Sequence, residues 1–171
     1  MNLENIQVRI NKPYPEIEDA TDDKMTVGIL KNLATSRASE LSAILQYQYD
    51  ATLTHFTDDE IAKIIDEISV VEMSHLSMLM EAIVMFGGLP KYEDSQGNIF
   101  ATTGLMYPVK LKDMLMQNIE MEKGAIRDYR EATIRVRNES LKKLFERIIM
   151  DEERHLEIFE KLLRDIKFLS I

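Results

Sequence analysis

The sequence contains no cysteine, which excludes disulfide bonds, thiol nucleophiles, thiolate zinc sites and cysteine-ligated iron centres. Basic residues are in deficit, because 21 Lys and Arg stand against 30 Asp and Glu and give a formal net charge of −9. A nucleic-acid-binding protein usually presents a basic face, so this balance argues against nucleic acid as a partner. The same balance is compatible with attracting small cations.

The sequence also lacks a long uninterrupted apolar run. Its first residues contain no apolar stretch of signal-peptide length, and no window approaches 18 uncharged apolar residues. We therefore expect a soluble, cytoplasmic protein with no membrane contact. A chain of 171 residues is long enough for one domain with a substantial core and too short for two comfortable ones.

Proline and glycine are scarce, with four and six residues, and their positions divide the chain. Pro13 and Pro15 lie in residues 1–25, which we expect to form an irregular N-terminal arm, whereas residues 26–171 form the expected helical domain. Between the breaks, apolar residues recur at helical spacing, and Thr57 is the expected N-cap of the second helix. The predicted helices cover residues 26–56, 57–86, 110–137 and 141–168.

The lengths of the connections predict how these helices are arranged. Short links join the first helix to the second and the third to the fourth, so each pair should be an antiparallel hairpin. Residues 89–109 form a long connection without periodicity, and no strand pattern competes. The sequence therefore predicts an all-α fold, an antiparallel four-helix bundle with one long crossover between helices two and three.

Two of the predicted helices carry ionisable residues in the middle of an otherwise apolar seam. The second helix places Glu72 there, followed three residues later by His75. The fourth helix repeats the pattern 80 residues further on, with Glu152 and His155. Residues three apart on a helix share a face, so each Glu and His can reach the same point in the bundle.

The other two helices each place one Glu in the middle of the seam and a Tyr seven residues later. Glu40 and Tyr47 occupy these positions in the first helix, and Glu122 and Tyr129 recur 82 residues later in the third. The chain therefore reads as two related helical hairpins. Each hairpin supplies one Glu from its first helix and a Glu-x-x-His pair from its second.

Four carboxylates at one level of a core would be costly and would repel one another. Two divalent metal ions would neutralise them, and the two His rings would complete the ligand set as neutral nitrogen donors. Carboxylates with some imidazole and no thiolate suit Fe or Mn, and Zn is chemically acceptable. The alternative from the residues alone is a buried hydrogen-bonded network without metal.

Several residues have a second interpretation. Glu120 is a rival of Glu122, and Glu153 a rival of Glu152, but neither rival shares the apolar seam. The tyrosines at positions 47 and 129 are either core aromatics with a satisfied hydroxyl or donors that orient ligand carboxylates. In the second interpretation they are the candidate catalytic residues.

With these residues in view, the chain resembles the ferritin-like superfamily, and its sequence motifs are most similar to those of bacterioferritin. The resemblance lies in residues 40–47, in 72–75 followed by 87–90, and in 151–155. It implies a di-iron site, with two Fe ions per chain, that oxidises Fe²⁺ with O₂ or H₂O₂. Met73 matches the residue that in bacterioferritin ligates a haem between two subunits, which implies a haem site as a lesser expectation.

The sequence departs from these relatives in three ways, one of which is an N-terminal arm that is longer than that of the family. The chain after His155 is short for the extra small helix of bacterioferritin, which disfavours an iron-storage cage. Rubrerythrins usually carry a further Glu one turn beyond the third-helix ligand, where this chain has Ala125, and often a cysteine-ligated domain that is absent here. Manganese catalase shares the ligand scheme, so the motif leaves the choice between Fe and Mn open.

The leading expectation is an oxidoreductase of the ferroxidase or peroxidase type. Its electrons would come from Fe²⁺ or from a separate electron-donor protein, because cysteine-ligated redox centres are excluded. We also expect a homo-oligomer that is at least a dimer. The alternatives are an iron-storage cage similar to bacterioferritin, a dimanganese catalase and a metal-free helical interaction module.

Overall fold

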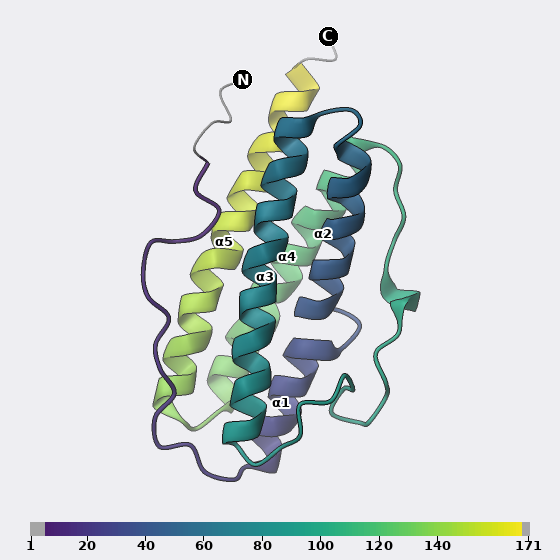
Figure 1. The fold of residues 1–171 in the computed structure, drawn as a ribbon. Helices are drawn as coiled ribbons and strands as arrows, with labels where there is room; N and C mark the ends of the chain where they lie inside the picture. Colours follow the sequence, from purple (N-terminus) through teal and green to yellow (C-terminus); the bar gives the residue numbers. More distant parts are fainter. Residues whose placement is uncertain (1–5, 169–171) are drawn as a thin grey trace.

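The computed structural model describes residues 6–168, and of these it describes the side chains up to residue 166. The described chain contains five α-helices and one short 3-10 turn, and its only strand-like pairing is an isolated bridge in the crossover. The helices are α1 (Lys24–Thr35), α2 (Glu40–Thr54), α3 (Asp59–Met85), α4 (Leu111–Arg135) and α5 (Glu139–Phe168), with η1 at Thr102–Gly104. Figure 1 shows α1 and α2 end to end in one position of a four-helix bundle. The predicted all-α bundle with one long crossover is confirmed.

The first predicted helix, residues 26–56, is wrong in one respect, because the structure divides it into α1 and α2. The chain is extended at Ser36 (φ −74°, ψ −179°), and Ser39 is the N-cap of α2. The Ser42 hydroxyl donates hydrogen bonds to the carbonyl oxygens of Ser36 and Arg37, at 3.2 and 2.9 Å. Serine hydroxyls give the backbone local partners other than those of a helix, which explains the break. The break puts Glu40 in the first turn of α2.

The N-terminus of α3 differs slightly from the prediction. Asp58, and not Thr57, is the N-cap, and its carboxylate accepts a hydrogen bond from the backbone N–H of Ile61 at 3.1 Å. At the other end, the chain turns at Gly87 with φ +81°, a left-handed conformation that glycine adopts without strain. Both ends of α3 are therefore fixed by local signals, as the sequence indicated in outline.

The apolar core consists of two clusters at opposite ends of the bundle. One cluster joins α1 to the end of α3 and the start of α5, with Leu30, Ile83 and Phe145 among its fully buried members. The other joins α2 to the start of α3 and the later turns of α5, and includes Ile65 and Phe159. The ionisable seam residues lie between these clusters, so they are shielded from water at both ends of the bundle.

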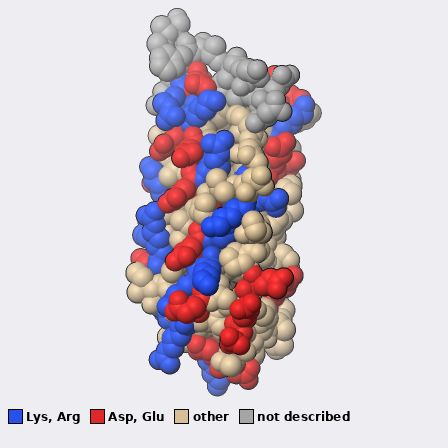
Figure 2. All heavy atoms as spheres, turned by 90° about the vertical axis from the view of Figure 1, so that its left-hand side faces the viewer, with Lys and Arg blue, Asp and Glu red and all other residues tan. Residues whose placement is uncertain are grey.

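The N-terminal arm, described over residues 6–23, is irregular but firmly attached to α5. Arg147 donates hydrogen bonds to the carbonyl oxygens of Lys12 and Ile10, at 2.9 and 2.7 Å, and Arg154 donates to that of Gln7 at 2.9 Å. Figure 1 shows the arm running along the bundle beside α5. Figure 2 shows this side of the molecule, where basic side chains run along the surface with acidic ones beside them. The arm is thus part of the folded bundle and covers one of its sides.

Helix α3 is long and apolar enough, by length and composition alone, to cross a membrane. This is weak evidence for a membrane span, since the core helix of a soluble bundle passes the same test. The helix packs mainly against α2 and α1. It also carries the buried Glu72 and His75 toward the bundle interior, as a core helix does.

Candidate metal centre

The six ionisable seam residues converge at the middle of the bundle. None of them is more than 5% exposed. They come from four helices, one from α2, two from α3, one from α4 and two from α5. The six residues are Glu40, Glu72, His75, Glu122, Glu152 and His155. A set of ionisable groups this deeply buried requires partners or counter-ions.

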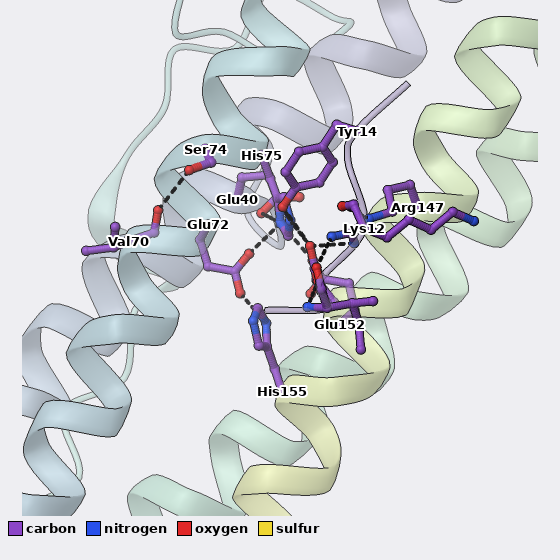
Figure 3. A network of polar contacts seen from close by, with 12 residues as sticks. Lys12, Tyr14, Glu40, Val70, Glu72, Ser74, His75, Arg147, Glu152 and His155 are labelled. Carbon is purple, nitrogen blue, oxygen red and sulfur yellow. Dashed lines mark hydrogen bonds and ion pairs between the residues drawn. The ribbon is translucent and has the colours of Figure 1, made fainter. Parts of the chain in front are cut away.

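Glu72 lies at the centre of this cluster, between the two histidine rings (Figure 3). Its Oε2 atom is 2.9 Å from Nδ1 of His75, and its Oε1 atom is 2.9 Å from Nδ1 of His155. Glu152 approaches from α5, with Oε1 at 3.0 Å from Nδ1 of His75. The two Nδ1 atoms therefore face the same group of carboxylate oxygens.

The cluster contains two overlapping groups of possible metal ligands. In each group, one ligand atom from each of four residues lies within 4.8 Å of the others, and Glu72 and Glu152 belong to both groups. We call the first group the His75 position, completed by Glu40 and His75, and the second the His155 position, completed by Glu122 and His155. Each position thus has one carboxylate and one imidazole of its own, and the two positions share two carboxylates. This is a ligand set that suits two adjacent metal ions.

The donor atoms fit a metal pair better than they fit a protein hydrogen-bond network. Oε1 of Glu72, Oε1 of Glu152 and both ring nitrogens of His155 are buried without a hydrogen-bond partner in the described structure. Nδ1 of His155 is close to Glu72, yet the angles do not suit a hydrogen bond. Unpartnered buried polar atoms are costly, and bound cations would satisfy them.

Each of the two seam tyrosines donates a hydrogen bond to a carboxylate of the cluster. The Tyr47 hydroxyl of α2 donates to Oε1 of Glu122 on α4 at 2.5 Å, and the Tyr129 hydroxyl of α4 donates to Oε1 of Glu40 on α2. Both tyrosines are almost completely buried. The two interpretations of these residues are therefore compatible, since each is a core aromatic whose hydroxyl orients a carboxylate. The pairing crosses between α2 and α4 in both directions.

Burial and mutual repulsion keep several of these carboxyls partly protonated when no cation is bound. Burial raises the pKa of Glu40 to about 7 and that of Glu152 to about 8. Burial and the nearby carboxylates hold the pKa of Glu122 well above its usual range. Glu72 behaves in the opposite way, because the two imidazoles outweigh burial and hold its pKa well below its usual range.

The two rival carboxylates do not belong to the cluster. Glu120 is exposed and pairs with Lys123, at 2.9 Å between Oε1 and Nζ. Glu153 is also exposed and pairs with Arg130 at 2.7 Å. Met73, the candidate haem ligand, is 44% exposed on α3 and is not part of the cluster.

The sequence analysis missed three residues on the side of the arm: Asp151 and Tyr14 contact the cluster at His75, and Arg147 pairs with Asp151. Oδ2 of Asp151 lies 3.3 Å from Nε2 of His75, accepts a hydrogen bond from the Tyr14 hydroxyl at 2.6 Å, and pairs with Arg147 at 2.8 Å. Burial acts to raise the pKa of Asp151, but hydrogen bonds from His75 and Tyr14 outweigh it and lower this pKa to about 2. The spacing of Arg147 and Asp151, four residues apart on one helix, was a detectable signal. Tyr14 had no such signal.

A pocket of about 410 Å³ lies between α2, α4 and the crossover. Its lining includes Glu40, Glu122 and Glu152, so it reaches the cluster from outside. The crossover is attached beside it, because the side-chain amide of Gln46 exchanges two hydrogen bonds with the backbone of Met106, at 2.8 and 3.0 Å. This pocket is a route by which a small molecule can reach the ionisable cluster.

The family follows from comparison with known proteins. Residues 31–163 match the family model described as rubrerythrin. This chain belongs to the rubrerythrin family. The expected ferritin-like superfamily is confirmed. The matching family model is that of rubrerythrin, whereas the sequence motifs are most similar to those of bacterioferritin. None of the curated proteins matches the chain.

Two solved structures illustrate the likeness of this rubrerythrin-family chain in fold. A manganese catalase, KatB from Anabaena PCC7120, superposes with a TM-score of 0.84 and 23% sequence identity, over 93% of this chain and 80% of the other. The bacterioferritin of Rhodobacter capsulatus, described with a metal-free dinuclear site and haem iron, superposes with a TM-score of 0.74 and 25% identity, over 87% of this chain and 89% of the other. Both comparisons place the chain in the ferritin-like fold.

Proposed function

We propose that this protein is a ferritin-like oxidoreductase that uses a carboxylate-bridged pair of metal ions to oxidise Fe²⁺, or an external reductant, with O₂ or H₂O₂. One observation carries the proposal. Two four-residue ligand groups overlap at Glu72 and Glu152 inside the bundle, and several of their buried donor atoms have no hydrogen-bond partner among the described residues. Membership in the rubrerythrin family supports the same interpretation.

The ligand assignment follows from the two groups. Glu40 and His75 would hold one ion, Glu122 and His155 would hold the other, and both ions would share Glu72 and Glu152. A bound pair of Fe or Mn ions supplies the two-electron redox chemistry that the protein side chains lack. The four carboxylates would balance the charge of two divalent ions.

The surrounding residues orient the ligands and exclude water. Hydrogen bonds from Tyr47 and Tyr129 each hold one oxygen of an unshared carboxylate, which leaves the second oxygen free to face the ions. The apolar clusters above and below keep bulk water from the site. The pocket between α2 and α4 leaves one route for small oxidants, in a region where Ala125 offers little bulk.

We propose that the electrons come from outside the chain. The sequence contains no cysteine, so a thiolate-ligated second redox centre is excluded. Fe²⁺ itself or a separate donor protein would therefore be the reductant. We also propose that the protein acts as a homo-oligomer of at least two copies, with residues 1–25 as an arm and 26–171 as the catalytic bundle.

Anaerobic titration of the metal-free protein with Fe²⁺, followed by H₂O₂, tests this function. We expect an optical change that saturates near two irons per chain and is lost in Glu72→Ala. Glu153→Ala is the matched control, because Glu153 is an exposed carboxylate on the same bundle that pairs with Arg130. A change that does not saturate, or that survives Glu72→Ala, would contradict the proposal.

A dimanganese catalase is the second candidate, favoured by the superposition on a manganese catalase over 93% of this chain. It predicts that the purified protein carries Mn and releases O₂ from H₂O₂ without any reductant. A ferroxidase or peroxidase needs a reductant for turnover.

An iron-storage cage is distinguished by light scattering, because it requires a large multimer. A Soret band in the absorption spectrum would reveal bound haem, and its absence would contradict a haem site at Met73.

A further inference from the structure

The two histidines of the cluster have different surroundings on the side away from the carboxylates. Nε2 of His75 lies 3.3 Å from Oδ2 of Asp151 and 3.3 Å from the Tyr14 hydroxyl. Nε2 of His155 is buried and has no hydrogen-bond partner in the described part of the chain. The two positions of the cluster therefore have the same types of ligand, but only the histidine of the His75 position has hydrogen-bond partners at its Nε2 atom.

This difference arises from one position at which the two repeated hairpins have different residues. Asp151 directly precedes Glu152, and the equivalent residue before Glu72, 80 positions earlier, is Val71. Val71 is buried and carries no hydrogen-bonding side chain. The second hairpin therefore supplies a carboxylate to the histidine of the first, whereas the first supplies only an apolar side chain at the corresponding position.

The N-terminal arm fixes Asp151 in place. Oδ1 of Asp151 accepts a hydrogen bond from the backbone N–H of Ile10 at 2.8 Å, and Oδ2 accepts one from the Tyr14 hydroxyl at 2.6 Å. The guanidinium of Arg147 pairs with the same carboxylate at 2.8 Å and lies 4.5 Å from the centre of the Tyr14 ring. Figure 3 shows Tyr14 and Arg147 on the side of His75 away from Glu72.

The chemical consequence concerns the two ring nitrogens of His75. Asp151 already pairs with Arg147, so its Oδ2 is an acceptor for the Nε2–H of His75. Nδ1 faces Glu72 and Glu152 and is the nitrogen that would bind a metal ion in place of its own proton. A carboxylate partner also makes the imidazole a stronger metal ligand and holds the ring in one orientation. His155 receives neither effect, because neither of its nitrogens has a hydrogen-bond partner in the described structure.

We propose that the two metal positions are unequal, and that the N-terminal arm makes them so. The His75 position takes the first ion and holds it more tightly, with Asp151 and Tyr14 as positioning residues, and the His155 position fills second. This inference rests on the proposed dimetal site. It goes beyond that site by assigning a function to the arm and an order to the loading.

Titration of the metal-free full chain with Mn²⁺ tests the order. Electron paramagnetic resonance distinguishes a single bound Mn²⁺ from a coupled pair, and equilibrium dialysis gives the dissociation constant of each step. We expect the single-ion signal to reach its maximum near one equivalent and the coupled signal to grow toward two. Two ions that enter together, or with equal affinity, would overturn the inference and leave the dimetal site intact. Failure to bind Mn²⁺ would overturn both.

A mirror-image pair of variants identifies the position that fills first. His155→Ala should keep the tight step and lose the weak one, whereas His75→Ala should lose the tight step. The opposite pattern, or equal losses in both variants, would contradict the assignment. A general loss of stability would weaken both steps, so the difference between the steps reports on position and not on folding.

Two further variants test the support from the arm. Asp151→Asn should weaken the tight step by about 10–100-fold and leave the weak step unchanged. Because this change leaves Arg147 without its anion, Tyr14→Phe provides a milder test that keeps the ring over the guanidinium and removes only the hydroxyl. We expect a smaller weakening, confined to the tight step. The control is Tyr49→Phe, whose hydroxyl donates to the Pro108 carbonyl at 3.1 Å. Equal binding by Tyr14→Phe and wild type would remove Tyr14 from the account.

Discussion

The two helical hairpins of this bundle supply nearly the same ligands but differ in what surrounds them. Both provide a Glu from one helix and a Glu-x-x-His pair from the next, and both contribute a tyrosine that orients a carboxylate of the other hairpin. Only the second hairpin contains the Arg147–Asp151 pair, which connects the cluster to the N-terminal arm. A duplicated seam can thus specify a metal centre, while residues outside the repeat make its two halves different.

Removing a shared ligand should have a much greater effect than removing an unshared one. Glu72 belongs to both ligand groups, so Glu72→Ala should abolish stable binding at both positions. Glu122 belongs only to the His155 position, so Glu122→Ala should leave one ion per chain. Elemental analysis after dialysis checks both values. Retention of two ions by Glu72→Ala would show that the cluster is not organised around a shared carboxylate.

The buried ion pair of the second hairpin should matter strongly for stability. Arg147→Met leaves the buried Asp151 without its cation, and breaking such a pair costs about 3–5 kcal/mol of the free energy of unfolding. The equivalent position in the first hairpin, 80 residues earlier, is the exposed Glu67. Glu67→Gln should change the free energy by less than about 0.5 kcal/mol. Urea unfolding of the metal-free protein measures both, and equal effects would refute the contrast.

The pH dependence of the metal-free protein should have an unusual sign. The folded state raises the pKa of Glu40 to about 7 and that of Glu152 to about 8, from an ordinary value of 4.5. Between pH 5 and pH 8 these carboxyls bind more protons when folded than when unfolded, so stability should fall as the pH rises. The pKa of His75, raised well above 6.5 by its carboxylate neighbours against the effect of burial, contributes a loss in the same direction above pH 6.5.

Thermal unfolding at pH 5, 6.5 and 8 measures this trend. Protein saturated with Mn²⁺ is the control, and its stability should not fall over the same range, because metal ions bind the deprotonated ligands and compete with protons. A metal-free melting temperature that rises from pH 5 to pH 8 would contradict the cause assigned to the trend.

Helix caps provide the mildest contrast between the hairpins. Asp58 caps α3 of the first hairpin through a hydrogen bond to the Ile61 N–H, whereas Lys110, at the N-cap of α4, makes no side-chain cap bond. Asp58→Ala should therefore lower the free energy of unfolding by about 1 kcal/mol. Lys110→Ala should have little effect. Chemical denaturation of both variants separates the two cases, and a similar loss in both would show that the Asp58 cap is not special.

The helical part of the fold could be predicted because its signal is periodic. Apolar seams, short links and one long connection were enough for the four-helix bundle, and the seam interruptions located the six clustered residues. The division between α1 and α2 was missed because residues 35–40 contain no proline or glycine to mark it, and the local serine hydrogen bonds that accompany the break leave no periodic signal.

The contacts of Tyr14 and Asp151 with His75 could not be predicted either, but for a different reason. Tyr14 is separated from His75 by 61 positions and from Asp151 by 137. It lies in a segment without periodicity, where no sequence rule indicates the contact. The Arg147–Asp151 spacing was visible, but its meaning depends on the arm that packs over it.

The account as a whole depends on dications between the four buried carboxylates. Anomalous diffraction from crystals of the protein loaded with Mn²⁺ tests this most directly, because it locates the ions independently of any activity. We predict two peaks, each bonded to both Glu72 and Glu152, with one also bonded to His75 and the other to His155. No peak within bonding distance of Glu72 and Glu152 would contradict it.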